Sequence, residues 1–144
     1  EDTDLGKGLV SELIRDSSGK ISCSLKQYII EEGLTDSVQT AIDDLCNFWQ
    51  ENRIASRKLL PHNVVAQQDA SGNVKRLVVI DGLGDPNLIP LKWLPQTIGN
   101  RKVAKNIAEF QRRIRKLCDE VEAGKTFSSK IGKLLHDGTS QQSD

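Results

Sequence analysis

The chain has 144 residues, of which 37% are hydrophobic and 28% are charged, and this balance suits one globular domain with a modest core. It excludes a disordered or collagen-like chain, and no apolar run approaches the roughly 20 residues that a membrane helix needs. The charges cancel overall, but residues 1–72 hold 7 basic and 12 acidic residues, whereas residues 73–144 hold 13 basic and 8 acidic. This asymmetry can steer an anionic ligand toward the second half of the chain.

The beginning of the chain and its cysteines indicate the compartment. The first residues, EDTDLGKG, have neither the basic region nor the apolar stretch of a signal peptide, so we expect a cytoplasmic protein. Cys23, Cys46 and Cys118 have no CxxC spacing and are expected to be buried, reduced thiols. The chain contains no methionine, which predicts that Glu1 is a cut inside, or at the edge of, something longer.

The first third of the chain predicts a strand, a turn and two helices. Residues 8–14 (GLVSELI) read as a short strand, and residues 15–20 (RDSSGK) as a turn. Ser24 can cap a short helix that Gly33 ends. A longer helix follows, with Asp36 and Gln39 as its capping box and core positions at steps of three and four residues: Val38, Ala41, Ile42, Leu45, Phe48 and Trp49.

A hairpin and a second long helix complete the predicted elements. Residues 63–68 and 74–81 are rich in β-branched residues and flank DASGN, a loop sequence that tolerates positive φ. Further along, an apolar stripe predicts a long helix that Gly124 ends, with core positions Val103, Ile107, Phe110, Ile114, Leu117 and Val121. The last 20 residues predict a short helix and a frayed polar tail.

The two polar ends of this hairpin suggest a metal site. In an antiparallel hairpin, the residue that enters the first strand and the residue that leaves the second lie side by side, so Asn63 and Asp81 are expected to converge. An amide and a carboxylate oxygen suit Mg²⁺, which completes its octahedron with water and phosphate oxygens. Pro61 fixes the turn before the Asn, and Gly82 leaves the backbone after the Asp unencumbered. The alternative is that both residues merely end their strands.

Two segments resemble motifs of protein kinases. RKLLPHNVV (57–65) is similar to the kinase catalytic loop RDLKPxNIL, and VVIDGLG (78–84) is similar to the strand that leads into the DFG motif. Three longer stretches extend the resemblance to about residues 1–115. Over that range the chain resembles the YrbL-type PhoP regulatory network family of bacteria, and the stretches are 8–25 (GLVSELIRDSSGKISCSL), 45–65 (LCNFWQENRIASRKLLPHNVV) and 77–91 (LVVIDGLGDPNLIPL).

The resemblance implies a fold and its divisions. The expected fold class is α+β: a mostly helical, kinase-like C-terminal lobe with the hairpin, plus the last strand and hinge of an N-terminal lobe. Residues 1–16 would form the end of that lobe and the hinge, residues 17–135 the C-terminal lobe, and residues 136–144 a disordered tail.

The resemblance also implies a nucleotide site. ATP would bind at the hinge through Leu13, Ile14 and Arg15, and Mg²⁺ through Asn63 and Asp81. Lys58 occupies the position of the kinase catalytic Asp, and together with Arg57 it could neutralise phosphate charge.

Two functions remain open at this stage. The first is an atypical ATP- and Mg²⁺-dependent phosphotransferase; the second is a non-catalytic pseudokinase or regulatory module that senses nucleotide or docks a partner. A partner could bind a basic surface on the second long helix, although a solvated face is the simpler interpretation; its residues are Arg101, Lys102, Lys105, Arg112, Arg113, Arg115 and Lys116. Sequence-specific DNA recognition is not expected, because neither base-reading aromatic residues nor a helix-turn-helix pattern is present. His62 and His136 are interpreted as surface residues.

Overall fold

The computed structural model describes residues 2–3, 6–7, 12–54, 56, 59–84, 95–125 and 127. Within these residues the fold is mixed α and β, with three helices and a three-stranded antiparallel sheet. The helices are α1 (Leu25–Glu32), α2 (Asp36–Asn52) and α3 (Gln96–Glu122). The sheet has the order β3-β4-β5, with bounds Cys23–Ser24, Val64–Gln68 and Val74–Val79. A separate short pair, β1 (Asp2–Thr3) and β2 (Gly6–Lys7), lies near the N-terminus.

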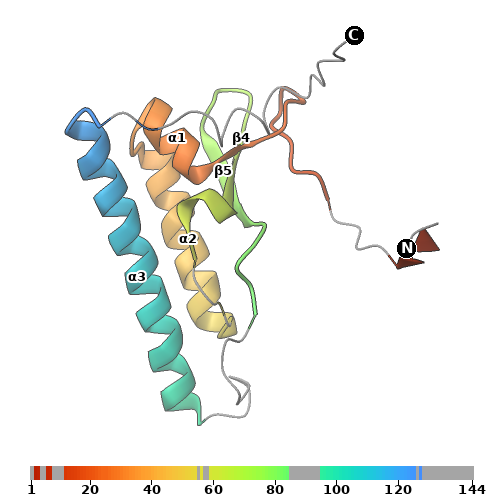
Figure 1. The fold of residues 1–144 in the computed structure, drawn as a ribbon, viewed down its shortest axis with the longest axis vertical. Helices are drawn as coiled ribbons and strands as arrows, with labels where there is room; N and C mark the ends of the chain where they lie inside the picture. The colour runs from red at the N-terminus through yellow and green to blue at the C-terminus, as the bar shows by residue number, and fades with distance from the viewer. Residues whose placement is uncertain are drawn as a thin grey trace.

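The helices and the sheet share one hydrophobic core. In Figure 1, α2 and α3 run side by side in opposite directions, and α2 lies between α3 and the β4–β5 hairpin. Phe110 of α3, Ile42 of α2 and Leu25 of α1 are fully buried, together with Val64 of β4. The two long helices therefore bury most of the core positions that their sequences predict. None of the helices in the described residues combines the length and apolar character that crossing a membrane requires.

Hydroxyl side chains cap the N-termini of the first two helices. Ser24 Oγ accepts a hydrogen bond from the Gln27 amide, and Gly33 follows the last turn of α1 with a φ of 78°, as predicted. The capping box predicted for α2 is wrong, because Thr35 precedes the helix in an extended conformation and its Oγ1 accepts from the Val38 amide at 3.4 Å. Asp36 is instead the first residue of α2.

The core face of α2 is narrower than the sequence suggested. Trp49 is 3% exposed, as expected for a core residue, but Phe48 is 56% exposed and its predicted core role is wrong. With about 100° of rotation per residue, Phe48 lies well away from the face that carries Val38, Ile42 and Trp49. Phe48 is thus a large aromatic side chain on the surface of the molecule.

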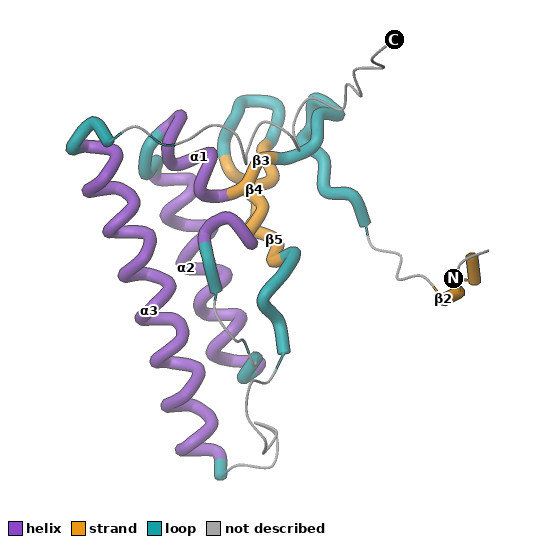
Figure 2. Tube along the Cα trace, viewed as in Figure 1, coloured by secondary structure: helices purple, strands orange, loops and turns teal. Residues whose placement is uncertain are grey.

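The predicted hairpin is confirmed. Val65 pairs with Val78 and Gln67 pairs with Arg76, and the register shifts after Gln67. Asp69 closes the connecting loop, since its Oδ1 accepts from two loop amides and its own amide donates to Asn73. Figure 2 shows the two strands of this hairpin with β3 beside them.

The predictions for the two ends of the chain have different outcomes. Residues 8–11 lie outside the described residues, and residues 12–14 are not in a strand; Arg15 instead forms an isolated antiparallel bridge with Ile21 around the predicted turn. At the other end, α3 stops at Glu122, and Gly124 follows with a φ of 69°. The predicted final helix and tail, residues 136–144 and His136 included, lie outside the described residues.

Candidate functional site

The two predicted metal ligands lie at the same end of the hairpin. A 3-10 turn, Pro61–Asn63, leads into β4, and β5 ends two residues before Asp81. The Ile80 amide donates to the Asn63 carbonyl oxygen at 2.9 Å, so Asn63 lies opposite Ile80. Asp81 is the next residue after Ile80, so Asn63 and Asp81 lie at the same end of the hairpin but are not directly opposite each other.

The chemistry of these two side chains suits a hard cation. Asn63 is half-buried and Asp81 is exposed. One carboxylate oxygen of Asp81, Oδ1, accepts from the Gly82 amide at 2.6 Å, and Gly82 adopts a φ of 87° that a side chain would strain. The Gly82 backbone thus orients the Asp81 carboxylate, and the second carboxylate oxygen has no hydrogen bond to any residue that the structure describes.

Two further site predictions, Arg57 and Lys58, lie outside the described residues. The residues on either side of them, Ser56 and Leu59, are both buried, at 3% and 4% exposed. Ser56 also forms an isolated antiparallel bridge with Leu83, two residues beyond Asp81. The structure therefore brings Ser56 next to the chain just after Asp81.

Helix α3 holds this segment through two polar side chains. Asn106 donates from Nδ2 to the Ser56 carbonyl oxygen at 3.1 Å and to Ser56 Oγ at 3.3 Å. Arg113 donates from Nη1 to the Leu59 carbonyl oxygen at 2.9 Å, while its Nη2 contacts Glu109 at 2.7 Å. Both ends of the four-residue segment 56–59 are thus hydrogen-bonded to one rigid helix.

Sequence reasoning missed both of these anchors. Arg113 was predicted to lie on the outer surface of α3, but its side chain is only 21% exposed. Asn106 is a polar residue beside Ile107 and between Val103 and Phe110 on the inward face of the helix. A polar side chain within an apolar stripe was the available signal, because such a group is buried only when it has a hydrogen-bond partner.

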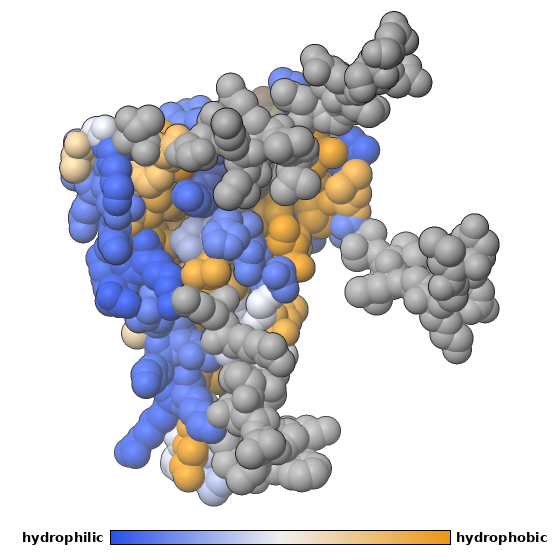
Figure 3. All heavy atoms as spheres, viewed as in Figure 1, coloured by the Kyte–Doolittle hydropathy of each residue, from blue (hydrophilic) through white to orange (hydrophobic). Residues whose placement is uncertain are grey.

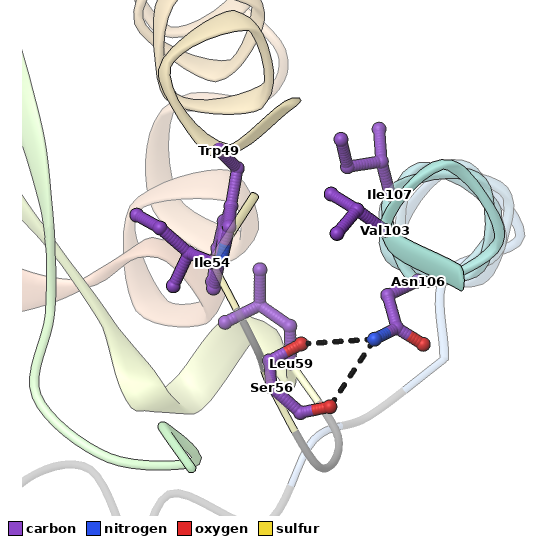
Figure 4. Close-up of a pocket in the computed structure, with 7 residues that line it drawn as sticks. All are labelled: Trp49, Ile54, Ser56, Leu59, Val103, Asn106 and Ile107. Carbon is purple, nitrogen blue, oxygen red and sulfur yellow. Dashed lines mark hydrogen bonds between the residues drawn. The ribbon is translucent and has the colours of Figure 1, made fainter. Parts of the chain in front are cut away.

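A small cavity lies between α2 and α3, next to Asn106 and Ser56 (Figure 4). The indole Nε1 of Trp49 is buried there and has no hydrogen-bond partner within the described residues. The lining is mostly apolar, and Asn106 and Ser56 supply its polar edge. The lining residues are Trp49, Ile54, Ser56, Leu59, Val103, Asn106 and Ile107.

The three predicted hinge residues lie at the opposite end of β4. Leu13 is 55% exposed, and Ile14 is 7% exposed. The Arg15 carbonyl oxygen accepts a hydrogen bond from Gln67 Nε2 at 2.6 Å, near the end of β4. Gln67 is four positions after Asn63, which corresponds to about 13 Å along a strand.

The side chain of Asp16 attaches the segment around residues 13–15 to the sheet. It accepts from the Gln68 amide at 2.8 Å and from Ser22 Oγ at 2.6 Å. The Ser17 amide adds a hydrogen bond to the Gln68 carbonyl oxygen at 3.1 Å. Sequence reasoning did not identify Asp16 as an anchor, because its partners are 6 and 52 residues away.

The hairpin has one face on the core and one face directed away from it. Val64, Ala66 and Leu77 belong to the core, and strand alternation places Val65 and its partner Val78 on the opposite face. This outer face connects the segment around residues 13–15 to the end that carries the two predicted metal ligands. Val65 is itself buried, at 8% exposed, and the half-buried Val78 is the accessible apolar residue of this pair, with polar groups toward both ends of the face.

The cysteines are not candidates for catalysis. Burial raises the pKa of Cys23 to about 11, with Asp16 and Glu31 adding repulsion, and burial likewise raises the pKa of Cys46 to about 11. All three cysteines are free, and Cys118 is only partly buried. A reactive cysteine needs a lowered pKa and access, so the thiols of Cys23 and Cys46 behave as the predicted inert core groups.

Comparisons with known proteins agree with the sequence resemblance. Residues 1–115 match the family described as PhoP regulatory network protein YrbL. The chain is 32% identical over 100 residues to the YrbL proteins of Escherichia coli (strain K12) and of Shigella flexneri, which covers 64% of this chain and 47% of each relative. The chain therefore spans about half the length of the curated relatives it matches. No solved structure matches it significantly. With four fifths of its length matched by the family, the chain belongs to the YrbL family of PhoP regulatory network proteins.

Proposed function

We propose that this chain carries the nucleotide-binding face of an atypical, kinase-like phosphotransferase that works with ATP and Mg²⁺ in a PhoP-type regulatory network. The observation that carries the proposal is the position of two predicted sites at the two ends of one strand. The segment Leu13–Arg15 lies beside Gln67, and Asn63 and Asp81 lie at the start of β4, about 13 Å away. That separation is comparable to the length of an extended nucleoside triphosphate.

The outer face of the hairpin supports this orientation of the nucleotide. The base would lie toward residues 13–15, where backbone groups are close to Gln67. Val78, which is half-buried and pairs with the buried Val65, would supply an apolar contact beneath the ring or sugar. The phosphates would then extend toward Asn63 and Asp81.

Magnesium would bind where the phosphates reach the hairpin end. Mg²⁺ in nucleotide sites takes one or two protein oxygen ligands and fills its remaining positions with phosphate oxygens and water. Asn63 and Asp81 would provide these two ligands. When bound, the ion would neutralise phosphate charge, which is the main requirement of phosphoryl transfer.

The basic pair Arg57 and Lys58 would complete the phosphate end of the site. Their neighbours Ser56 and Leu59 are hydrogen-bonded to α3, and Ser56 forms a bridge with Leu83. An ammonium at residue 58 cannot accept the proton of an acceptor hydroxyl, as a carboxylate would. Its expected contribution is therefore charge neutralisation, and transfer would be slow.

A non-catalytic nucleotide sensor is the second candidate, favoured by Lys58 at the position where the kinase resemblance implies an Asp. The two candidates share the binding site and differ in turnover. Binding is measured by the thermal shift that ATP produces with and without Mg²⁺, and turnover by loss of the γ-phosphate over hours. Both are measured on this chain and on the full-length YrbL of Escherichia coli, because the chain spans only 47% of that relative.

Each outcome has a defined meaning. A Mg²⁺-dependent shift with phosphate release that Asp81→Ala abolishes supports the phosphotransferase. The same shift without release supports the sensor. If neither protein gives a Mg²⁺-dependent shift, the nucleotide-binding proposal is wrong. Asp44→Ala is the control for the loss of a carboxylate, because Asp44 is exposed on α2, far along the chain from the hairpin end.

A further inference from the structure

The outward face of α3 carries a row of basic side chains that the nucleotide site does not use. We call this row the basic stripe, and its exposed members are Arg101, Lys105, Arg112, Arg115 and Lys116. With 3.6 residues per turn, these positions fall within an arc of about 100° and span about 22 Å along the helix axis. Figure 3 shows hydrophilic side chains along the outer edge of α3.

Most of the basic stripe is not neutralised within the described residues. Arg112 pairs with Glu109 at 2.7 Å, and this contact raises the pKa of the Arg112 guanidinium. Arg101, Lys105 and Arg115 form no ion pair or side-chain hydrogen bond among the residues that the structure describes. Clustered positive charge of this kind attracts a polyanion rather than a single small anion.

Acidic side chains gather on α2, so the molecule has an acidic surface on one helix and a basic surface on another. α2 contains no lysine or arginine, and its exposed positions include Asp36, Asp43, Asp44 and Glu51. A polyanion would be repelled from α2 and attracted to α3. The acidic excess of the first half of the sequence thus includes the surface of α2, and the basic excess of the second half includes the surface of α3.

The composition of the basic stripe distinguishes between partners. Ala108 is exposed between its basic residues, and from Arg101 to Lys116 the stripe contains no large apolar or aromatic side chain, while the exposed Ile98 lies three residues before Arg101. Protein interfaces have an apolar, aromatic-rich centre, and single-stranded nucleic acids are held by aromatic stacking. Surface-bound membrane helices insert an apolar face, but the apolar face of α3 is buried in the core. Nucleic-acid duplexes, in contrast, are bound through a polar and strongly positive surface.

We infer that the basic stripe binds the phosphate backbone of double-stranded nucleic acid without reading its sequence. A duplex presents one phosphate per 1.7 Å of axis, so a stripe of about 22 Å can contact several phosphates at once. The small side chain of Ala108 between the basic residues lets the helix approach the backbone closely. The surface is separate from the hairpin face and does not depend on nucleotide binding there.

The test uses a pair of double variants with the same change in net charge. Lys105→Gln with Arg115→Gln removes two members of the basic stripe, and glutamine preserves helix propensity. Lys20→Gln with Lys75→Gln removes two exposed lysines from loop and sheet positions outside the stripe. Circular dichroism and thermal unfolding confirm that both variants of the 144-residue chain remain folded.

Binding is measured by fluorescence anisotropy with two labelled 20-base-pair duplexes of unrelated sequence, between 20 and 200 mM KCl. We expect equal affinity for both duplexes, a loss of at least fivefold in the stripe variant, and a salt slope shallower by about 1.8 for two lost phosphate contacts. The Lys20/Lys75 variant is expected to lose less than twofold.

Three results would overturn the inference. One is no binding by the wild-type chain at 20 mM KCl, which would make the stripe a solvated face. Another is an equal loss in both double variants, since that would reflect net charge alone. The third is displacement of the duplex by poly-L-glutamate at equal charge concentration as effectively as by unlabelled duplex, which would indicate an acidic protein partner.

Discussion

Arg112 and Arg113 are adjacent arginines that contact the same acid but have different roles. Arg112 is exposed and, among the residues that the structure describes, forms an ion pair with Glu109 alone, whereas Arg113 is 21% exposed and also donates to the Leu59 carbonyl oxygen. From sequence they were indistinguishable members of one basic helix. Only the hydrogen bond from Arg113 to Leu59 separates them, and no local pattern encodes that contact.

The two arginines give a matched pair of variants. Arg113→Gln leaves a buried backbone carbonyl without its donor, so we expect the free energy of unfolding to fall by about 1–2 kcal/mol. Arg112→Gln removes only a surface ion pair, and we expect no measurable change. Urea unfolding of both variants is the measurement. Equal effects would show that the Leu59 contact does not stabilise the fold.

The buried thiols predict how stability depends on alkaline pH. The pKa values of Cys23 and Cys46 are about 11 in the folded protein and near the ordinary 9.0 in the unfolded chain, so the unfolded chain loses its protons first. Stability is therefore fully present below pH 9 and falls between pH 9 and 11, by about 1 kcal/mol per pH unit for each thiol. Denaturant titrations across this range test the slope, and Cys46→Ala should make it shallower. An unchanged slope in that variant would contradict the assignment.

At the scale of elements, sequence reasoning located most helices and strands but not all their ends or faces. The hairpin followed from β-branched runs around a loop rich in Asp, Gly and Asn, because those residues determine their own local geometry. The beginning of α2 was placed one residue late, since Thr35 and Asp36 are both good caps and only the backbone conformation distinguishes them. The exposure of Phe48 likewise depends on which part of α2 its neighbours cover.

The cap of α2 gives a test at this scale. Thr35→Ala removes the acceptor for the Val38 amide and a contact with the Tyr28 hydroxyl, so we expect a loss of about 1 kcal/mol in unfolding free energy. Asp36→Ala should cost clearly less, because Asp36 only contributes negative charge to the first helical turn. Thermal unfolding of the two variants measures the difference. The reverse order would mean that Asp36 is the cap.

At the scale of the molecule, the sequence predicted the candidate metal ligands better than the residues that anchor the surrounding segments. Asn63 and Asp81 could be placed at one end of the hairpin, because two strands and a short loop fix which ends meet. The one-residue offset between them depends on the register, which the sequence does not specify at that end. Asp16, Asn106 and Arg113 could not be assigned, since each joins segments that are far apart along the chain.

The central claim is that a metal nucleotide lies at the end of the hairpin, and Mn²⁺ can locate it directly. Mn²⁺ replaces Mg²⁺ at oxygen ligands and broadens the NMR signals of nearby nuclei. With ATP and substoichiometric Mn²⁺ added to the ¹⁵N-labelled chain, we predict that broadening is strongest at the amides of residues 62–64 and 80–83, weakens with distance from them, and is lost in Asp81→Ala. Broadening centred on the acidic surface of α2, or unchanged broadening in Asp81→Ala, would contradict the account.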